Sequence, residues 1–201
     1  MLRLMDESMH VRPWDPLRTI ETDRLRLRPP EFQDRDGVWS AAHHPANITK
    51  GMQWDPPKTK EEPDEFTRTA IDGWEKGDQF TWSIDAKDAD EFVGRVAILK
   101  RKDKNDRWYI GYWLHPDRHG QGYMAEAAKA AVDAVFEHMG IDSIISSHAS
   151  WNAASGKVLQ KIGMRHMGHD PEGFRKNGER HPEEQYELTR EEWLRSLKGA
   201  T

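Results

Sequence analysis

The sequence predicts a mixed α/β fold of the α+β kind, in which a central, mainly antiparallel sheet is flanked by helices. Strand and helix patterns mix along the chain, three strand patterns follow one another over residues 79–114, and a long amphipathic helix pattern comes directly after them. Such an order is typical of α+β domains. A length of 201 residues fits one domain, so we expect an N-terminal arm over residues 1–20 and a single domain over residues 21–197.

The first part of this domain has the pattern of one strand and two helices. Residues 22–28 alternate leucine with arginine, which is the period of a half-buried strand. Residues 32–43 and 58–76 have helical patterns, and Pro57 stands near the start of the second, where helices favour proline. Three tryptophans lie in and between these helices, and tryptophan most often packs in a core: Trp39, Trp54 and Trp74.

The rest of the chain predicts a meander of three antiparallel strands and then alternating helices and strands. Apolar residues recur at three- and four-residue intervals in the first of these helices, and Gly140 ends the pattern. Strand patterns cover residues 79–85, 91–100, 107–114, 143–149, 164–169 and 185–189, and helix patterns cover residues 121–139, 153–162 and 190–197.

Composition excludes several classes of function. The chain has no cysteine, so it has no disulfide, no thiolate zinc site and no cysteine nucleophile. A net charge of −5 disfavours nucleic acid as a partner, and an acidic surface would tolerate cationic substrates better. No segment has the length and apolarity of a membrane span or the pattern of a signal peptide. We therefore expect a cytoplasmic protein without membrane contact.

A glycine-rich turn at the start of the long helix carries the most information about function. The N–H groups at a helix N-terminus bind phosphate oxygens. A P-loop is excluded, because it needs Lys and then Ser or Thr where Tyr123 and Met124 follow Gly122. Residues 120–125 satisfy the dinucleotide pattern Gly-x-Gly-x-x-Ala, but five residues separate the glycines from the preceding strand and no acidic residue ends the next one. A dinucleotide-binding oxidoreductase stays an alternative.

Three segments resemble the GCN5-related N-acetyltransferases (GNAT), in particular the RimJ/RimL branch. Residues 111–127, from Gly-Tyr-Trp-Leu through the glycine turn, are similar to the family's pyrophosphate loop. His119 and Met124 depart from the general pattern of that loop, and the RimJ/RimL branch is looser at both positions. Residues 152–164 resemble the branch's Asn-x-x-Ser helix, and residues 22–28 resemble its first strand. The resemblance covers roughly residues 20–195. Because members of the family place variable helices at the substrate cleft, the resemblance makes Trp39, Trp54 and Trp74 candidates to line such a cleft.

The resemblance implies a GNAT-like fold with a splayed sheet, and acetyl-coenzyme A, or another acyl-coenzyme A, as co-substrate. Ser155 is the implied acid that protonates the departing thiolate, and Asn152 the implied neighbour of the cofactor arm as well as a helix cap. Arg118 and Lys161 are further candidates to attract the phosphates. The implied cofactor-binding residues are Leu114, His119, Gly120, Gln121, Gly122, Tyr123, Met124, Asn152 and Lys157.

The expected activity is direct transfer of the acyl group to a primary amine, of a small molecule or of a peptide, including a protein N-terminus. An α-amine, with a pKa near 7.7–8.0, needs far less help to lose its proton at pH 7 than a lysine near 10.4. His148, Glu183 and Glu184 are candidates for the base, by position only. A non-catalytic coenzyme A-binding domain is the other alternative, and a homodimer is left open.

We expect no bound metal. His166, His169 and His181 are the histidines that a metal site would use, but their spacing matches no established pattern of ligands.

Overall fold

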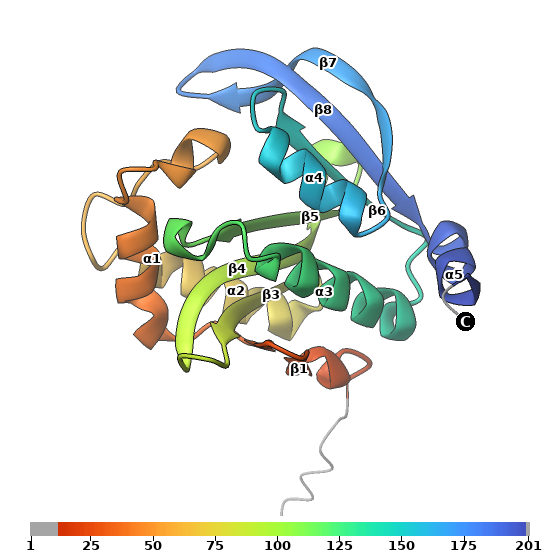
Figure 1. Ribbon diagram of the computed structural model, residues 1–201, viewed down its shortest axis with the longest axis horizontal. Helices are drawn as coiled ribbons and strands as arrows, with labels where there is room; N and C mark the ends of the chain where they lie inside the picture. Colours follow the sequence, from red (N-terminus) through yellow and green to blue (C-terminus); the bar gives the residue numbers. More distant parts are fainter. Residues whose placement is uncertain (1–11, 200–201) are drawn as a thin grey trace, which may run out of the picture.

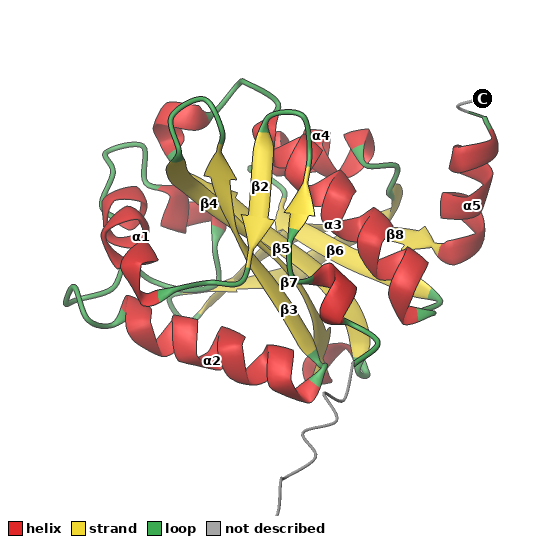
Figure 2. Ribbon diagram, turned by 90° about the horizontal axis from the view of Figure 1, so that it is seen from below, coloured by secondary structure: helices red, strands yellow, loops and turns green. Residues whose placement is uncertain are grey.

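The computed structural model describes residues 12–199, which form one sheet of eight strands in the order β1-β2-β3-β4-β5-β6-β8-β7 with helices on both faces. Figure 1 shows α3 and α4 on one face, and Figure 2 shows α1 and α2 on the other. The strands are β1 (Ile20–Glu21), β2 (Leu25–Arg28), β3 (Gln79–Ala86), β4 (Glu91–Arg101), β5 (Arg107–Leu114), β6 (Ser143–Ala149), β7 (Arg165–Lys176) and β8 (Glu179–Thr189). The α-helices are α1 (Arg35–Ala42), α2 (Pro63–Lys76), α3 (Tyr123–Met139), α4 (Ala153–Lys161) and α5 (Arg190–Lys198).

The predicted fold class is confirmed, because the sheet is antiparallel at every neighbouring pair of strands except β5 and β6. The predicted meander is formed by β3, β4 and β5. The bounds of β5 and β6 are those that the sequence patterns predict.

The sheet splits between β5 and β6. These strands pair only at Trp108 with Ile144 and at Tyr109 with Ile145, whereas β5 stays paired with β4 as far as Leu114. Side chains join the two edges where they begin to part: Ser146 Oγ donates to the carbonyl of Ile110 over 2.9 Å. Main-chain groups of β5 after Ile110 therefore face a gap and not a strand, which is the splayed arrangement that the resemblance implies.

The helix expected over residues 58–76 begins later, at Pro63. Proline is tolerated in the first turn of a helix, where its missing N–H has no intrahelical partner anyway, and residues 58–62 form turns before it. Trp74, at 1% exposure, packs in the core against Phe80 and Trp82, so it does not line a cleft. Trp39 stacks on His43.

Strands β7 and β8 are much longer than the sequence patterns predict. They form a hairpin joined at Asn177 and Gly178, both with positive φ (53° and 79°), and it arches over the rest of the sheet in Figure 1. Residues 170–184 are rich in charge and contain prolines and glycines, so they lack the apolar alternation by which strands are recognised. Most side chains of β7 are exposed, which explains why no such alternation exists there.

The expected arm lies partly outside the described residues, since residues 1–11 are not among them. Its remainder includes a short 3-10 helix (Asp15–Leu17) and packs against the domain: Leu17 is fully buried. The indole N–H of Trp82 donates to the Leu17 carbonyl over 2.7 Å.

Candidate active site

The glycine turn leaves main-chain N–H groups available at the start of α3. Gly120 and Gly122 have φ values of 76° and 81°, in the left-handed region that favours glycine. Gly122 is the N-cap of α3, and no described side chain accepts a hydrogen bond from the first N–H groups of the helix there. The positive end of the helix dipole and these free donors together favour the binding of an anion.

Arg24 holds the glycine turn in place from β2. Its Nη1 donates to the carbonyl of Gln121 over 2.9 Å, its Nε donates to Glu126 Oε2 over 2.7 Å, and its guanidinium lies 4.7 Å from the ring centre of Tyr123. Desolvation alone would raise the pKa of Glu126, but hydrogen bonds from Thr22 and Arg24 outweigh it and hold that pKa below its ordinary value. The carboxylate in the first turn of α3 is thus neutralised by protein groups.

His119 stabilises the other side of the turn. Its Nε2 lies 2.9 Å from the carbonyl oxygen of Leu114. A carbonyl only accepts, so Nε2 carries the proton and donates. This hydrogen bond links the last residue of β5 to the residue that precedes the glycines.

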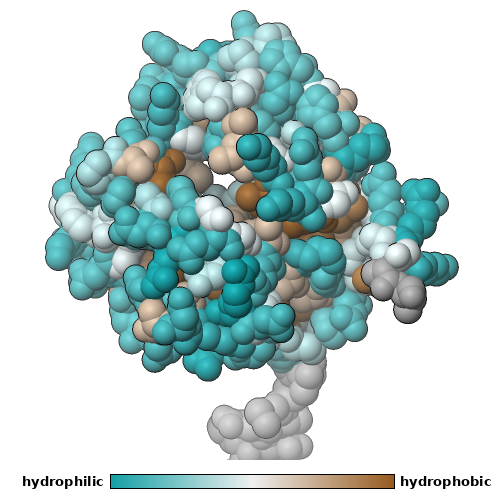
Figure 3. Space-filling model, in the orientation of Figure 1, coloured by the Kyte–Doolittle hydropathy of each residue, from teal (hydrophilic) through white to brown (hydrophobic). Residues whose placement is uncertain are grey.

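A cavity of about 780 Å³ lies beside this turn, between α4 and the 3-10 helix η3 (Ile48–Gly51). It is visible as a hollow near the centre of the face in Figure 3. Gln121 does not line it, since its side-chain amide is 3.5 Å from the carbonyl of Asp117. The predicted cofactor residues that do line it are Leu114, His119, Gly120, Gly122, Tyr123, Met124, Asn152 and Lys157.

Three lysines give the rim of this large cavity a positive charge. Lys50, Lys157 and Lys161 line it and are exposed, and none of them has an ion pair with another described residue. Arg118 also lines it, but its guanidinium is 2.6 Å from Glu91 and 3.5 Å from Asp88. The charge that a bound phosphate would meet therefore comes from the lysines more than from Arg118.

A second cavity, of about 410 Å³, adjoins the first. It extends over the face of the sheet that α2 covers, where Ala97 and Gly111 leave room. Trp54 lines it, as the tryptophan-cleft hypothesis predicts for one of its three residues. The residues that line both cavities, and so mark their junction, are Gly51, Met52, Tyr112, Trp113, Asn152 and Ser155.

Tyr112 and Ser155 form a hydrogen-bonded pair at this junction. The hydroxyl of Tyr112 lies 3.0 Å from Ser155 Oγ and 3.0 Å from the Ser155 carbonyl. Burial raises the pKa of Tyr112, so its phenol keeps its proton near neutral pH. Asn152 Oδ1 accepts from the Ser155 N–H over 3.4 Å, which confirms the helix-cap prediction for Asn152. Sequence reasoning missed Tyr112, since only the fold brings it to Ser155.

The three base candidates have different surroundings. His148 lines the smaller cavity and is buried. Its Nδ1 lies 2.9 Å from the Ala149 carbonyl and must donate to it, so the lone pair of the neutral ring is on Nε2. That Nε2 is buried and has no hydrogen-bond partner among the groups that the structure describes.

The two glutamates are less suited to the role of base. Glu183 is buried, lies 3.7 Å from Lys104 and lines neither cavity. Glu184 accepts hydrogen bonds from His169, Ser150 and His166, which lower its pKa to about 2. A carboxylate held by three donors is a weak base.

The three histidines considered as metal ligands do not come together. His166 and His169 flank Glu184, whereas the His181 ring packs 5.1 Å from Trp151. Among the side chains that the structure describes, those of residues 12–102 and 104–199, no group of three or more His, Asp or Glu is placed to hold a metal ion. In the same residues no helix is long and apolar enough to cross a bilayer.

A splayed sheet, an anion-binding turn at a helix start and a two-part cavity define an acyl-coenzyme A-dependent acyltransferase. Residues 24–165 match the model of the acetyltransferase (GNAT) domain, so the chain belongs to the GNAT family, whose members transfer an acyl group from coenzyme A to an amine.

Known proteins of similar sequence and structure carry acetyltransferase names. The chain is 29% identical over 175 residues to the N-acetyltransferase YnaD of Bacillus subtilis, covering 87% of this chain and 98% of that one. It is 28% identical over 200 residues to the FsC-acetyl coenzyme A-N(2)-transacetylase of Aspergillus fumigatus, covering 90% and 80%. The fold matches RimL, a ribosomal L7/L12 α-N-protein acetyltransferase solved with coenzyme A, with a TM-score of 0.75 and 20% identity, covering 85% and 97%.

Proposed function

We propose that this enzyme transfers an acetyl group, or a related acyl group, from acyl-coenzyme A directly to a primary amine while both substrates are bound. The observation that supports this most is the meeting of two cavities at Tyr112 and Ser155. The larger cavity has the anion-binding turn and the lysines, and suits the donor. The smaller one is left for the amine. Two adjoining sites bring the reactants together without a covalent enzyme intermediate.

The donor is bound mainly by main-chain groups. The N–H groups of residues 119–120 and 122–124 hold the pyrophosphate, and Lys50, Lys157 and Lys161 attract its phosphate charges. The pantetheine arm lies along β5, whose edge is unpaired after Ile110. Main-chain N–H groups near Leu114 polarise the thioester carbonyl, as donors preorganised for a developing oxyanion do.

The Tyr112–Ser155 pair supplies the proton that the leaving group needs. When the amine attacks the thioester carbon, a C–N bond forms, the C–S bond breaks and a thiolate leaves. Ser155 Oγ passes its proton to this thiolate and takes one back from solvent, while the Tyr112 hydroxyl, which keeps its proton, lies within hydrogen-bond distance of the same oxygen. Asn152 fixes the first turn of α4 and with it the position of Ser155.

His148 takes the proton from the attacking amine, directly or through a water molecule. It has the free, buried lone pair that a base requires, and it lines the cavity assigned to the amine. Gly156 leaves space for it: a Cβ atom there would lie 2.7 Å from His148 Nε2. An acceptor with an α-amine, such as an amino acid or a protein N-terminus, suits a single histidine base better than a lysine side chain does.

The names of two similar proteins support an amine as the acceptor. RimL acts on a protein α-amine, and the Aspergillus enzyme is named a transacetylase. A branch assignment to RimJ/RimL rests on the resemblance of residues 111–127 and 152–164.

The experiment that tests this function measures thiol release from acetyl-coenzyme A over a panel of amines. We expect turnover with at least one α-amine and micromolar binding of acetyl-coenzyme A by calorimetry. Binding without turnover on any amine would favour a non-catalytic coenzyme A-binding domain. Binding of reduced nicotinamide cofactor in place of acetyl-coenzyme A would favour the oxidoreductase.

The His148 role predicts an effect that depends on the acceptor. His148→Gln should lower kcat/KM for an aliphatic α-amine by about 10²–10³-fold. The loss should be much smaller for a hydrazide, whose nitrogen is already neutral at pH 7. The matched control is His138→Gln, an exposed histidine on α3. Equal losses on both acceptors would show that His148 is only structural.

A further inference from the structure

The cavity assigned to the amine is lined by no acidic residue, although the chain has 35 Asp and Glu. This statement covers the side chains that the structure describes, which are those of residues 12–102 and 104–199. Its lining does include Arg95 from the middle of β4, together with Arg101 at the end of that strand. In a chain with a net charge of −5, a site of this composition disfavours polyamines and other polycationic acceptors, contrary to the expectation from the overall charge.

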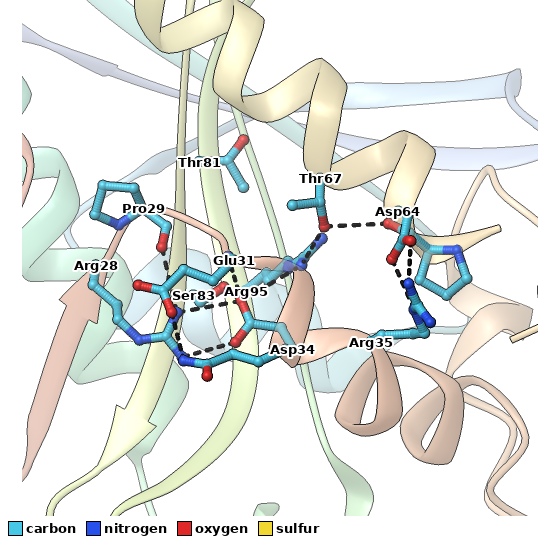
Figure 4. Close-up of polar contacts among 12 residues, drawn as sticks. Arg28, Pro29, Glu31, Asp34, Arg35, Asp64, Thr67, Thr81, Ser83 and Arg95 are labelled. Carbon is cyan, nitrogen blue, oxygen red and sulfur yellow. Dashed lines mark hydrogen bonds and ion pairs between the residues drawn. The ribbon is translucent and has the colours of Figure 1, made fainter. Parts of the chain in front are cut away.

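Arg95 is more than nine-tenths buried, at 7% exposure, and is incompletely paired. Figure 4 shows its side chain between Asp34 and Thr67. Its Nη2 donates to Thr67 Oγ1 over 3.1 Å and lies 3.7 Å from Asp34 Oδ2. Its Nε is buried and has no hydrogen-bond partner in the part of the chain that the structure describes.

Asp34 is engaged more closely by other groups than by Arg95. Arg28 Nη2 donates to it over 2.7 Å, Ser83 Oγ over 2.5 Å and the N–H of Glu31 over 2.9 Å. The Asp34 carboxylate therefore offsets the positive charge of Arg95 only weakly. Desolvation lowers the pKa of Arg95, but a guanidinium stays charged in proteins. A buried guanidinium with an unpaired N–H donor costs free energy unless an anion binds to it.

The strand register places Arg95 beside Trp113, and both residues line the same cavity as Tyr112 and Ser155. Arg95 pairs with Trp113, the neighbour of Tyr112, and adjacent strands lie about 4.8 Å apart. One part of the lining is aromatic, since the ring centre of Trp54 lies 6.5 Å from that of Trp113 and 6.4 Å from that of Phe66, whereas Thr, Ser and Gln side chains line other parts. A volume of about 410 Å³ is in the range of small-molecule sites.

We propose that the acceptor is a small amine that also carries a carboxylate, with an apolar or aromatic body, as in an aromatic α-amino acid. The carboxylate binds Arg95, the body packs against Trp54, Phe66 and Trp113, and the amine reaches the junction at Tyr112 and Ser155. This inference rests on the proposed function, because it assumes that the smaller cavity holds the acceptor.

The first test compares three acceptors of one shape on the wild-type enzyme: phenylalanine, phenylalaninamide and phenethylamine. We expect kcat/KM, from thiol release, to be at least tenfold higher for phenylalanine. The amide has the less basic amine, which favours the amide, so a preference for the acid is not an effect of amine basicity. If phenylalaninamide and phenethylamine, which lack the carboxylate, turn over as well as phenylalanine or better, the inference is wrong and the proposed function still stands.

The second test removes the cation. Arg95→Gln should reduce the preference for phenylalanine over phenethylamine to about one, and Arg95→Lys should restore part of it. The matched control is Arg68→Gln, an exposed arginine on α2. Unchanged acetyl-coenzyme A affinity shows that each variant is folded. If folded Arg95→Gln keeps the wild-type preference for phenylalanine over phenethylamine, Arg95 does not bind the carboxylate.

A third measurement needs neither a variant nor turnover. The amine-free acid 3-phenylpropanoate should bind the wild-type enzyme by calorimetry and compete with the amine, not with acetyl-coenzyme A. If no amine releases thiol but this acid binds, the proposed function fails and the anion site stands. If thiol is released and the acid neither binds nor competes, the anion site fails alone.

Discussion

Gly122 has a backbone conformation that few other residues adopt, and it stands where α3 presents its free N–H groups. A Cβ atom at this position would lie 3.5 Å from Arg24 Nη2, which is an ordinary contact. The cost of a side chain therefore comes from its φ of 81° and not from crowding within the protein. To relieve that strain, the turn would have to rotate its N–H groups away from the cavity.

We expect Gly122→Val to lower acetyl-coenzyme A affinity by more than tenfold, measured by calorimetry. Gly140→Val is the control, because Gly140 has a φ of 60°, lies at the other end of α3 and lines neither cavity. It carries comparable backbone strain without touching the turn. Similar affinity losses in both variants would refute a specific role for the turn.

The sequence pointed to some residues of the candidate site and not to others. The cap role of Asn152 was predicted from its position directly before a helix pattern, because a helix cap is a local feature, and the role of Ser155 was implied by the family resemblance of residues 152–164. Tyr112 and Arg95 were not predicted, because their significance depends on partners 43 and 28 residues away, Ser155 and Thr67. No spacing rule connects such positions.

At the scale of elements, the hairpin of β7 and β8 is held partly by Glu184, which accepts from His169, Ser150 and His166. These donors lower the pKa of Glu184 from 4.5 to about 2. A carboxyl with a lowered folded-state pKa contributes stability that is fully present above its unfolded value and is lost as the pH falls toward the folded one. The window is therefore about pH 4.5 down to 2.

Glu184→Gln should accordingly reduce the free energy of unfolding at pH 6, and its difference from the wild type should shrink as the pH falls through 4.5. Urea unfolding at several pH values measures this. Glu191→Gln, an exposed position on α5, provides the comparison and should show no such trend. A difference that stays constant from pH 6 to pH 3 would contradict the role of Glu184.

The extent of the β7–β8 hairpin was not predicted from the sequence patterns, although its turn has a clear sequence signature. Asn177-Gly178 is a strong marker of a two-residue hairpin turn, because both residues tolerate positive φ. The residues on both sides of this turn are mostly polar, because β7 is largely exposed. They therefore lack the apolar alternation from which strands are predicted. The pairing with β8, and through it with β6, forms these strands in spite of their weak apolar pattern.

At the scale of the whole molecule, the segment before β1 is part of the core. Leu17 is fully buried, and its carbonyl accepts from Trp82. Removing a buried leucine side chain costs the transfer free energy and leaves a cavity. The N-terminal segment therefore contributes to the stability of the sheet that positions the site.

Leu17→Ala should lower the free energy of unfolding by about 2–5 kcal/mol. Chemical denaturation at pH 7 measures it. Leu194→Ala, at 43% exposure, should change stability by less than about 0.5 kcal/mol. A near-zero effect of Leu17→Ala would mean that this segment separates from the core in solution.

By itself the sequence determined the fold class, the bounds of β5 and β6, the glycine turn and the cap of α4, because apolar periodicity, glycine conformation and capping act over a few neighbouring residues. Only the tertiary structure decided the residue at which β5 and β6 part, the junction of two cavities and the incomplete pairing of Arg95. These depend on which distant segments pack together, and packing is set by the whole core and not by any local pattern.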